Sequence, residues 1–446
     1  MTAGGRRVIA YAKSTVVSST PVRPGKTYPL SVLDHAMGLH SLHMVFYFRP
    51  GPTLDRARLK ESLSDMLWHF PAATGRLCLD EGKKWLVKCN DAGVRVVDAR
   101  AAATLEEWIA TATAAEEREL AYWEPMGDDP SIWSCFYVQI TEFSDMGYAV
   151  GLSCTHLHVD PTCAVLIIKA WGDCHRRACI VNPPFLYPPA LLPRPEPNPS
   201  APFLSLKSSL SSTNPAAVAA SGRRMSSATF HFSAAAVRSL LADLRPDFPA
   251  ATPFDALAAL FWLAVARAAG QRDAGAGALT VVTDFRKRMY APLPHGFYGN
   301  AAHFSRVEAD FAAGWASVAA AVGRHVAGLV EEDYWSAIEW LAARRESGVF
   351  RMYGPELTCV KMDHVLAYQV EMAEGAAPVH MSCWVGGAEG EGMVVVLPAP
   401  AAAVVAEGDE AGRAVEVALP AELAEKVFRD EEILRRGPTV LFSGKI

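Results

Sequence analysis

Two histidines and an aspartate lie close together in the stretch CTHLHVDPTC, residues 154–163. One residue separates His156 from His158, and Asp160 follows the first histidine by four positions. Two imidazoles and a carboxylate can chelate zinc when one face of a strand presents them. A histidine of near-neutral pKa can instead accept a proton from a hydroxyl or amine nucleophile, while the aspartate braces its loop. A third interpretation is that both histidines are buried structural residues.

The segment that positions these residues begins as a buried strand. The run YAVGLSCTHLHVD is apolar and β-rich, which predicts a central strand over residues 148–157. Pro161 then either ends the extended segment or opens the next helix. His156 and His158 would project from the same face of that strand. Because no second cluster of His, Cys or Asp with ligand spacing occurs in the sequence, an acid–base or structural role is favoured over a metal site.

The composition is that of a two-domain protein with sizeable cores. The chain has 446 residues, 51% of them hydrophobic, so two domains of roughly 150–250 residues each are expected. The net charge of −6 is mild and the basic residues form no sustained stripe, which argues against nucleic acid or an anionic membrane surface as a partner. Nine cysteines without paired CxxC spacing suit reduced thiols in a cytoplasmic protein.

No targeting or membrane segment is expected. The N-terminal apolar run is short and is interrupted by Lys13, so it does not resemble a signal peptide. No stretch approaches the roughly 18 uninterrupted apolar residues of a membrane span. The sequence therefore predicts a protein without a membrane span of its own.

A proline- and serine-rich stretch over residues 182–222 divides the chain into two halves. Prolines block helix formation and remove backbone donors, so this stretch is interpreted as an extended crossover linker between domains at 1–181 and 223–446. Strand and helix periodicities alternate irregularly in both halves, which predicts an α+β (mixed α/β) fold. The clearest expected strands are 38–48, 134–143, 379–386 and 391–399, and the clearest helices are 54–70 and 252–269, the latter capped by Thr252.

Motifs along the whole chain resemble those of a known family, the plant BAHD acyltransferases, which use acyl-CoA donors. LSVLD at 30–34 is similar to the family's LSxLD opening, and LKESLSDMLWHFPAATGRL at 59–77 to its LxxSLSxxLxxFxPxAGRL helix. CNDAGVRVVDA at 89–99 resembles a family strand, and the HxxxD motif follows at 156–160. TDFRKRMYAPLPHGFYGNA at 283–301 is similar to the block DxRxRxxPPLPxGYxGN. Together these motifs are specific for the fold.

The resemblance implies two domains of chloramphenicol-acetyltransferase-like topology, joined by a long crossover, with a channel between them. Acyl-CoA and the acceptor would meet there at His156, the general base, and the acceptor would attack the thioester directly. Asp160 would pair with Arg286 and fix the loop, and His158 would be structural. Thr358 would lie near the oxyanion. No permanently bound cofactor and no metal are implied.

Three positions depart from the family pattern. EMAEG at 371–375 stands where the family has DFGWG, so the usual support on the CoA side is changed. Val360 replaces the tryptophan of a threonine-x-tryptophan pair that begins at Thr358. Losing one oxyanion donor typically costs about 2.7–4 kcal/mol of transition-state stabilisation. Pro161 replaces the glycine that commonly follows HxxxD, which stiffens the turn.

The last third of the chain resembles one clade more narrowly, the Eceriferum and Glossy proteins of cuticular wax. Members of that clade show LTxVxxD, as residues 357–363 do here, and lack DFGWG. This resemblance implies work with a β-ketoacyl-CoA synthase at the surface of the endoplasmic reticulum, which extends very-long-chain acyl-CoAs.

Two functional hypotheses remain at this point. The first is an accessory protein of the condensing enzyme, which residues 371–375 and Val360 favour. The second is an acyl-CoA-dependent O- or N-acyltransferase with His156 as base, which the intact HxxxD motif and the 283–301 block favour. Acyl-CoA is the expected donor or ligand in both.

Overall fold

The structure is a computed structural model that divides into two compact units. Unit 1 comprises Met1–Leu192, Leu293–Asn300 and Leu366–Gly386, and unit 2 comprises the remaining segments Pro193–Pro292, Ala301–Val365 and Gly387–Ile446. The residues that the structure describes are 6–52, 54–82, 84–186, 191–192, 194, 224–270, 276–343, 352–353, 356–388, 392–400 and 411–446. Most of the predicted linker over 182–222 therefore lies outside the described residues.

Unit 1 is built on a six-stranded sheet, and one of its two edge strands comes from late in the sequence. The strands β6 and β7 are parallel, and all other neighbours are antiparallel. In spatial order the strands are β1 (Val8–Val16), β6 (Val94–Ala101), β7 (Phe136–Glu142), β8 (Tyr148–Thr155), β3 (Ser41–Phe48) and β13 (His380–Gly386).

The pairing of β13 with β3 explains why the units are not simple halves of the sequence. His380 to Gly386 pair with Tyr47 to Ser41 in an unbroken antiparallel register. The stretches 293–300 and 366–386, which a linear division would place in the C-terminal domain, group with unit 1 instead.

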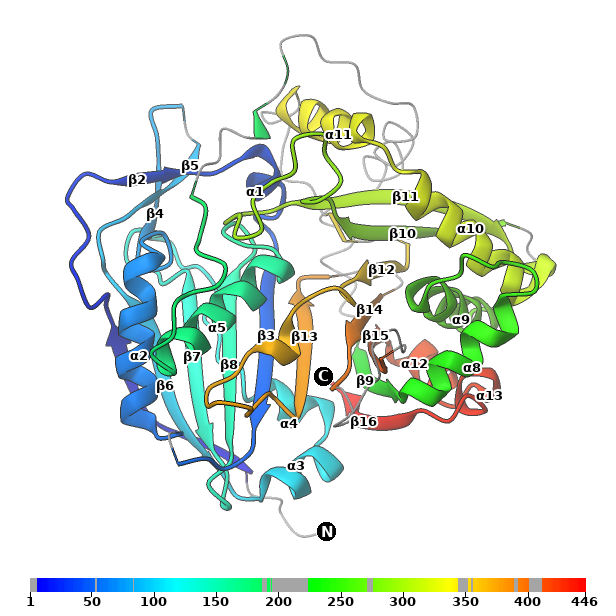
Figure 1. The fold of residues 1–446 in the computed structure, drawn as a ribbon, viewed down its shortest axis with the longest axis horizontal. Coiled ribbons are helices and arrows are strands. Elements are labelled where there is room, and N and C mark those ends of the chain that lie inside the picture. The colour runs from blue at the N-terminus through cyan, green and yellow to red at the C-terminus, as the bar shows by residue number, and fades with distance from the viewer. Residues whose placement is uncertain are drawn as a thin grey trace. The chain divides into compact units, whose positions relative to one another are not determined.

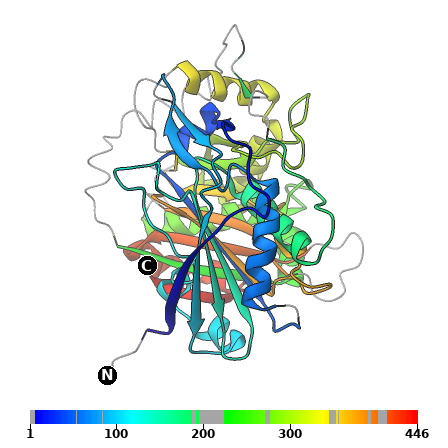
Figure 2. The same ribbon diagram turned by 90° about the vertical axis from the view of Figure 1, so that its left-hand side faces the viewer.

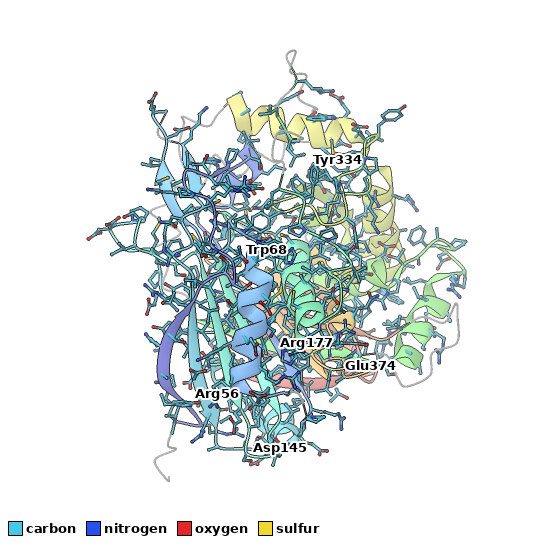
Figure 3. The ribbon with its side chains drawn as sticks, turned by 60° about the vertical axis from the view of Figure 1, so that its left-hand side comes forward. Arg56, Trp68, Asp145, Arg177, Tyr334 and Glu374 are labelled. Atoms are coloured by element: carbon cyan, nitrogen blue, oxygen red, sulfur yellow. The ribbon has the colours of Figure 1, made fainter. Side chains whose placement is uncertain are left out.

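Two helices lie on one face of the six-stranded sheet, α2 (Arg56–His69) and α5 (Pro161–His175) (Figure 1, Figure 2). They pack against each other, and the indole of Trp171 on α5 donates to the Leu59 carbonyl of α2 at 3.1 Å. Asp55 caps α2, and its buried residues recur at helical spacing. Arg56 and Trp68 are seen at its opposite ends (Figure 3). The predicted helix over 54–70 is thus confirmed as α2.

Smaller elements complete unit 1. They are a three-stranded sheet of β2 (Thr27–Pro29), β5 (Trp85–Lys88) and β4 (Arg76–Leu79), the short helices α1 (Val32–Ala36), α3 (Leu105–Thr111) and α4 (Ala114–Arg118), and the 3-10 turn η3 (Ala367–Gln369).

Unit 2 contains a seven-stranded sheet with a parallel centre, because β10, β12 and β14 run in the same direction. In spatial order its strands are β11 (Ala302–Asp310), β10 (Ala276–Asp284), β12 (Thr358–Lys361), β14 (Met393–Pro398), β15 (Arg413–Pro420), β9 (Met225–Phe232) and β16 (Thr439–Lys445). Its helical elements are α8 (Ala234–Leu244), α9 (Pro253–Ala268), η2 (Phe311–Ala313), α10 (Gly314–Gly328), α11 (Glu331–Ala343), α12 (Ala421–Val427) and α13 (Glu431–Leu434).

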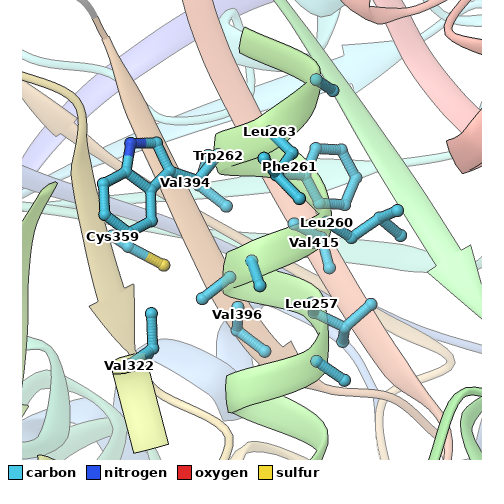
Figure 4. Packing of buried hydrophobic residues seen from close by; sticks show 14 of the residues in the cluster. Leu257, Leu260, Phe261, Trp262, Leu263, Val322, Cys359, Val394, Val396 and Val415 are labelled. Atoms are coloured by element: carbon cyan, nitrogen blue, oxygen red, sulfur yellow. The ribbon is translucent and has the colours of Figure 1, made fainter. Parts of the chain in front are cut away.

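The core of unit 2 surrounds α9, which is buried over almost its whole length. Figure 4 shows Leu257 and Phe261 of α9 beside Val394, Val396 and Val415 of the sheet. Thr252 caps the helix, as predicted. A helix that is apolar on all sides belongs in a core, which is where α9 lies.

The predicted mixed α/β class is confirmed, and the expected strands at 38–48, 134–143, 379–386 and 391–399 correspond to β3, β7, β13 and β14. The nine cysteines all lie in the described ranges, and none of them forms a disulfide. Across the described ranges, no helix combines the length and the apolar composition that a membrane crossing requires.

Candidate functional site

The HxxxD motif forms a tight turn between β8 and α5 rather than the end of a strand. The strand stops at Thr155, and the His158 amide donates back to the Thr155 carbonyl at 3.2 Å. The predicted central strand is confirmed as β8, but it ends at Thr155, so the expectation that both histidines project from one face of a strand is wrong. The physical reason is that Asp160 caps α5 and Pro161 occupies its first turn, so the chain must reverse before them.

His156 is fully buried, and its backbone is hydrogen-bonded on both sides. Its amide donates to the His40 carbonyl at 3.0 Å, and its carbonyl accepts from Asn300 Nδ2 at 2.8 Å. Burial lowers the pKa of the imidazole to about 4, although hydrogen bonding to the backbone of His156 itself, to the Asn300 side chain and to the Val159 backbone raises it in part. The ring is therefore neutral at pH 7.

The Asn300 amide belongs to a polar network around the first turn of α1. Asp34 Oδ1 accepts from the Asn300 backbone N at 2.9 Å and from its Nδ2 at 2.7 Å. Asp34 Oδ2 accepts from the Ser31 backbone N at 2.7 Å, and Ser31 Oγ accepts from the Asp34 amide at 3.2 Å. Burial raises the pKa of Asp34 to about 6, against these hydrogen bonds, which lower it.

His158 lies in an aromatic environment inside unit 1. Its Nδ1 is 3.2 Å from the Tyr298 hydroxyl, and its ring meets that of Phe136 edge-on with centroids 5.4 Å apart. The Tyr28 hydroxyl donates to the Tyr298 carbonyl at 2.8 Å. Burial lowers the pKa of His158 to about 3. These contacts suit the structural role expected for it, which stays a prediction.

Asp160 and Arg286, the expected supports of the site, are both buried. Asp160 Oδ1 accepts from the Cys163 amide at 2.9 Å in the first turn of α5. In unit 2, the Arg286 guanidinium donates to Asp284 Oδ2 at 2.8 Å. Burial alone would raise the pKa of Asp284, but Arg286 and His364 hold it below its ordinary value. The pairing of Asp160 with Arg286 stays a prediction.

Thr358 and Val360 lie on β12 in the parallel centre of the unit 2 sheet, and both are buried. Thr358 pairs with Thr280 of β10 and Met393 of β14, and its amide donates to the Gly392 carbonyl at 3.0 Å. The oxyanion role of Thr358 stays a prediction.

The divergent EMAEG segment is anchored to α5. Glu371 pairs with Arg176 at 2.9 Å, and a Cβ atom on Gly172 would lie only 2.6 Å from the Glu371 carbonyl oxygen. Arg177 at the end of α5 and Glu374 of the segment are labelled in Figure 3. The segment is therefore packed in unit 1 at the C-terminal half of the helix that the HxxxD turn begins.

Sequence reasoning assigned no role to Asp34 and Asn300, although both lie in motifs that support the family resemblance. A signal was present for one of them, because Ser31-x-x-Asp34 has the spacing of a capping box. Asn300 has no such local signal. Among the residues that the structure describes, no group of three or more His, Cys, Asp or Glu is arranged to hold a metal ion.

Comparison with known proteins identifies the family and similar folds. A family model described as "Transferase family" matches residues 7–432. "Protein ECERIFERUM 26-like" of Arabidopsis thaliana is 28% identical over 95% of each chain. Among solved structures, vinorine synthase is similar with a TM-score of 0.71 and 17% identity, over 96% of this chain and 98% of that one. F. graminearum TRI101 complexed with coenzyme A and deoxynivalenol is similar with a TM-score of 0.73 and 13% identity, over 93% and 100%.

Proposed function

Because the chain belongs to the Transferase family, as one of the plant BAHD acyltransferases with ECERIFERUM proteins among its relatives, we propose that it promotes elongation of very-long-chain acyl-CoAs. It does so with a β-ketoacyl-CoA synthase at the surface of the endoplasmic reticulum, to which that partner recruits it. The observation that carries the proposal is the similarity to ECERIFERUM 26-like over 95% of both chains.

The state of His156 supports an accessory role over acyl transfer. A general base works best when its pKa lies near the operating pH. Burial lowers the pKa of His156 to about 4, so the neutral ring has a weak affinity for the proton of an acceptor. The side chain of Val360 also has no N–H donor, whereas many family members have a tryptophan at this position.

Acyl-CoA is the proposed ligand. The family resemblance implies an acyl-CoA donor, and the structurally similar TRI101 of F. graminearum was crystallised with coenzyme A. In the accessory role the protein holds the acyl-CoA and alters which chain lengths the synthase extends, so no group is transferred to a second substrate.

The test is co-expression with a very-long-chain β-ketoacyl-CoA synthase in a host that makes long acyl-CoAs. Wild type, His156→Ala and His156→Gln are compared, and the chain-length profile of the acyl products is measured by mass spectrometry. We expect all three to lengthen the products equally. Near-ultraviolet circular dichroism checks that the variants are folded.

Two outcomes would overturn the proposal. If wild type shifts no chain length with any synthase tried, the accessory role is wrong. If folded His156 variants lose the extension, the imidazole performs chemistry. The alternative activity, direct transfer of an acyl group to a hydroxyl or amine, would then be tested by following transfer from acyl-CoA to model alcohols and amines.

A further inference from the structure

A pocket of about 230 Å³ lies over β1, β6 and β7, at one edge of the six-stranded sheet in unit 1. On one face of these strands, Lys60 of α2 contacts Ser14 Oγ at 3.2 Å and Asp98 at 2.6 Å. Because side chains alternate along a strand, the neighbouring positions that line the pocket lie on the opposite face. The polar side chains of the pocket are those of Lys13, Thr15, Arg95, Tyr122, Glu124 and Tyr137.

The sheet register places two cationic side chains next to each other in this pocket. Thr15 of β1 pairs with Arg95 of β6, which in turn pairs with Tyr137 of β7. Lys13 pairs with Val97, two positions from Arg95, so Lys13 and Arg95 are diagonal neighbours on one face. Long side chains at diagonal positions of a sheet are within reach of each other. Both are exposed, so a ligand from solvent can contact them together.

One of the two cations is neutralised inside the pocket. Lys13 Nζ donates to Glu124 Oε1 at 3.0 Å, and the Tyr122 hydroxyl donates to the same oxygen. The Tyr137 hydroxyl donates to Glu124 Oε2 at 3.3 Å. The hydrogen bonds from Tyr122 and Lys13 hold the pKa of Glu124 below its ordinary value. Both carboxylate oxygens are therefore occupied, and Lys13 and Glu124 together add no net charge.

Arg95 carries the charge that this arrangement leaves uncompensated. Its guanidinium donates to the hydroxyl of Thr15, which is a neutral group, and no carboxylate among the described residues forms an ion pair with it. A guanidinium has five N–H donors, so most of those of Arg95 are available to a ligand. The Thr15 hydroxyl accepts from Arg95 and keeps its own hydrogen to donate. The pocket therefore has a net positive charge and several donors for an anion.

The segment that carries Tyr122 and Glu124 is held in place by aromatic side chains. The Trp133 indole donates to the Glu124 carbonyl at 2.9 Å. The Trp123 ring meets the rings of Trp133 and Tyr137 edge-on, with centroids 5.4 Å apart in both cases. A site whose walls are fixed before the ligand arrives loses less entropy on binding. This wall of the pocket is therefore preorganised.

We propose that the pocket binds the phosphate group of a small ligand, with Arg95 as its main contact and Thr15 and Lys13 as further donors. Arginine forms paired hydrogen bonds with phosphate oxygens, and a tetrahedral phosphate can also accept from a hydroxyl on another side. Pockets for drug-sized ligands usually measure about 300–1,000 Å³, so the smaller volume here suits a phosphate on a short stem. The inference goes beyond the proposed function, because it concerns a second ligand on the sheet face opposite α2.

Isothermal titration calorimetry of the full chain tests this site. Inorganic pyrophosphate and glycerol 3-phosphate are the probes, and sodium chloride keeps the ionic strength constant within each titration. Wild type is expected to bind both probes, with an affinity that falls when the titration is repeated at higher salt. Arg95→Gln is expected to lose at least about tenfold in affinity, because it removes the charge-assisted hydrogen bonds to the phosphate.

Two further variants separate this site from a general attraction of anions. Arg100→Gln removes the same charge from the same strand, but Arg100 faces the α2 side, where its guanidinium lies 5.3 Å from the centroid of the Tyr11 ring. Its affinity for the probes should stay within about twofold of wild type. Glu124→Gln removes the negative charge of the pocket and releases Lys13, so binding should tighten by about threefold or more. A folding defect would not produce such a gain.

The proposal is overturned if wild type binds neither probe. It is also overturned if Arg95→Gln and Arg100→Gln weaken binding equally, because the probes would then respond only to the net charge of the protein, or if Glu124→Gln leaves the affinity unchanged. Circular dichroism and the melting temperature show whether each variant is folded. If Arg95→Gln does not fold, the comparison of Glu124→Gln with Arg100→Gln decides the question alone.

Discussion

Two helices, α1 in unit 1 and α9 in unit 2, begin with the same local device. Each has a capping box in which a Ser or Thr pairs with an aspartate three positions later, Ser31 with Asp34 and Thr252 with Asp255. Both aspartates are buried, and burial raises the pKa of each above its ordinary value. At the level of local sequence the two boxes are equivalent.

They differ in what the second carboxylate oxygen contacts. Asp34 Oδ1 accepts two hydrogen bonds from Asn300, whose amide continues to His156. Asp255 has no such extension among the described residues, and its environment includes Lys361, which lowers its pKa in part. The box of α9 caps its helix, while the box of α1 is also linked through Asn300 to the HxxxD turn. Tertiary partners, rather than the capping motif, make this difference.

The largest effect should come from removing the link that distinguishes the two boxes. Asn300→Ala deletes the amide that satisfies Asp34 and the His156 carbonyl, and leaves a buried carboxylate with one donor fewer. We expect the free energy of unfolding to fall by roughly 3–5 kcal/mol. Urea unfolding followed by fluorescence measures this. A loss below about 1 kcal/mol would mean that the network contributes little.

The pH dependence of stability should separate Asp34 from its asparagine substitute. The pKa of Asp34 rises from its ordinary 3.8 to about 6 in the folded chain. The native state therefore binds more protons than the unfolded chain between these values, so this carboxyl lowers stability as pH rises from 4 to 6. The stability of wild type minus that of Asp34→Asn should fall by up to about 3 kcal/mol over that range. A difference that is flat or rises with pH would contradict this.

A glycine lies beside the aspartate carboxylate of each capping box. Substitution by alanine should destabilise the protein at both positions, but for different physical reasons. At Gly323 of α10, a Cβ atom would lie 2.9 Å from Asp255 Oδ2 and 2.7 Å from the Phe248 ring. At Gly299, the space beside Asp34 is adequate, but φ is +129°, which L-residues rarely adopt.

We expect Gly323→Ala to destabilise by about 1–2 kcal/mol, because overpacking exceeds the gain in helix propensity. Gly299→Ala should cost about 1–3 kcal/mol through backbone strain. Thermal unfolding measures both. Crystal structures of the two variants would distinguish a displaced Phe248 from a changed backbone at 299. If Gly323→Ala stabilised the protein, this would contradict the close packing of α10 against Phe248 and Asp255.

The smallest effect should come from the cap hydroxyls themselves. Ser31→Ala and Thr252→Ala each remove one hydrogen bond to the backbone at the third helical position, and each should cost about 1 kcal/mol. Guanidinium unfolding curves of the two variants measure both losses of stability. Because the hydroxyls act only locally, the costs should agree within about 0.5 kcal/mol despite the different tertiary settings. Unequal costs would show that the hydroxyl of Ser31 also supports the site.

Features that depend on local periodicity were predictable from the sequence. The helices α2 and α9 follow from apolar spacing and from caps at Asp55 and Thr252, and β3 follows from its β-rich composition. The end of β8 was not predictable in this way, because the apolar run continues past Thr155 while the cap at Asp160 forces the turn.

Long-range contacts could not be predicted from local sequence patterns. Asp34 and Asn300 are 266 positions apart, and no propensity or spacing joins them. The same holds for Glu371 and Arg176, which fasten the EMAEG segment to α5. Family motifs marked some of these residues, but the contacts that give them roles appear only in the folded chain.

The strand β13 has a consequence for how the protein is synthesised. Domains usually fold in order from the N-terminus as the ribosome releases them. Here β3 has no neighbour on one side until residues 380–386 have been translated, by which time most of unit 2 has also emerged. Unit 1 therefore finishes folding late, and an exposed strand edge must be kept from aggregating in the meantime. A nascent chain of this protein should consequently need chaperone protection for longer than its domain size suggests.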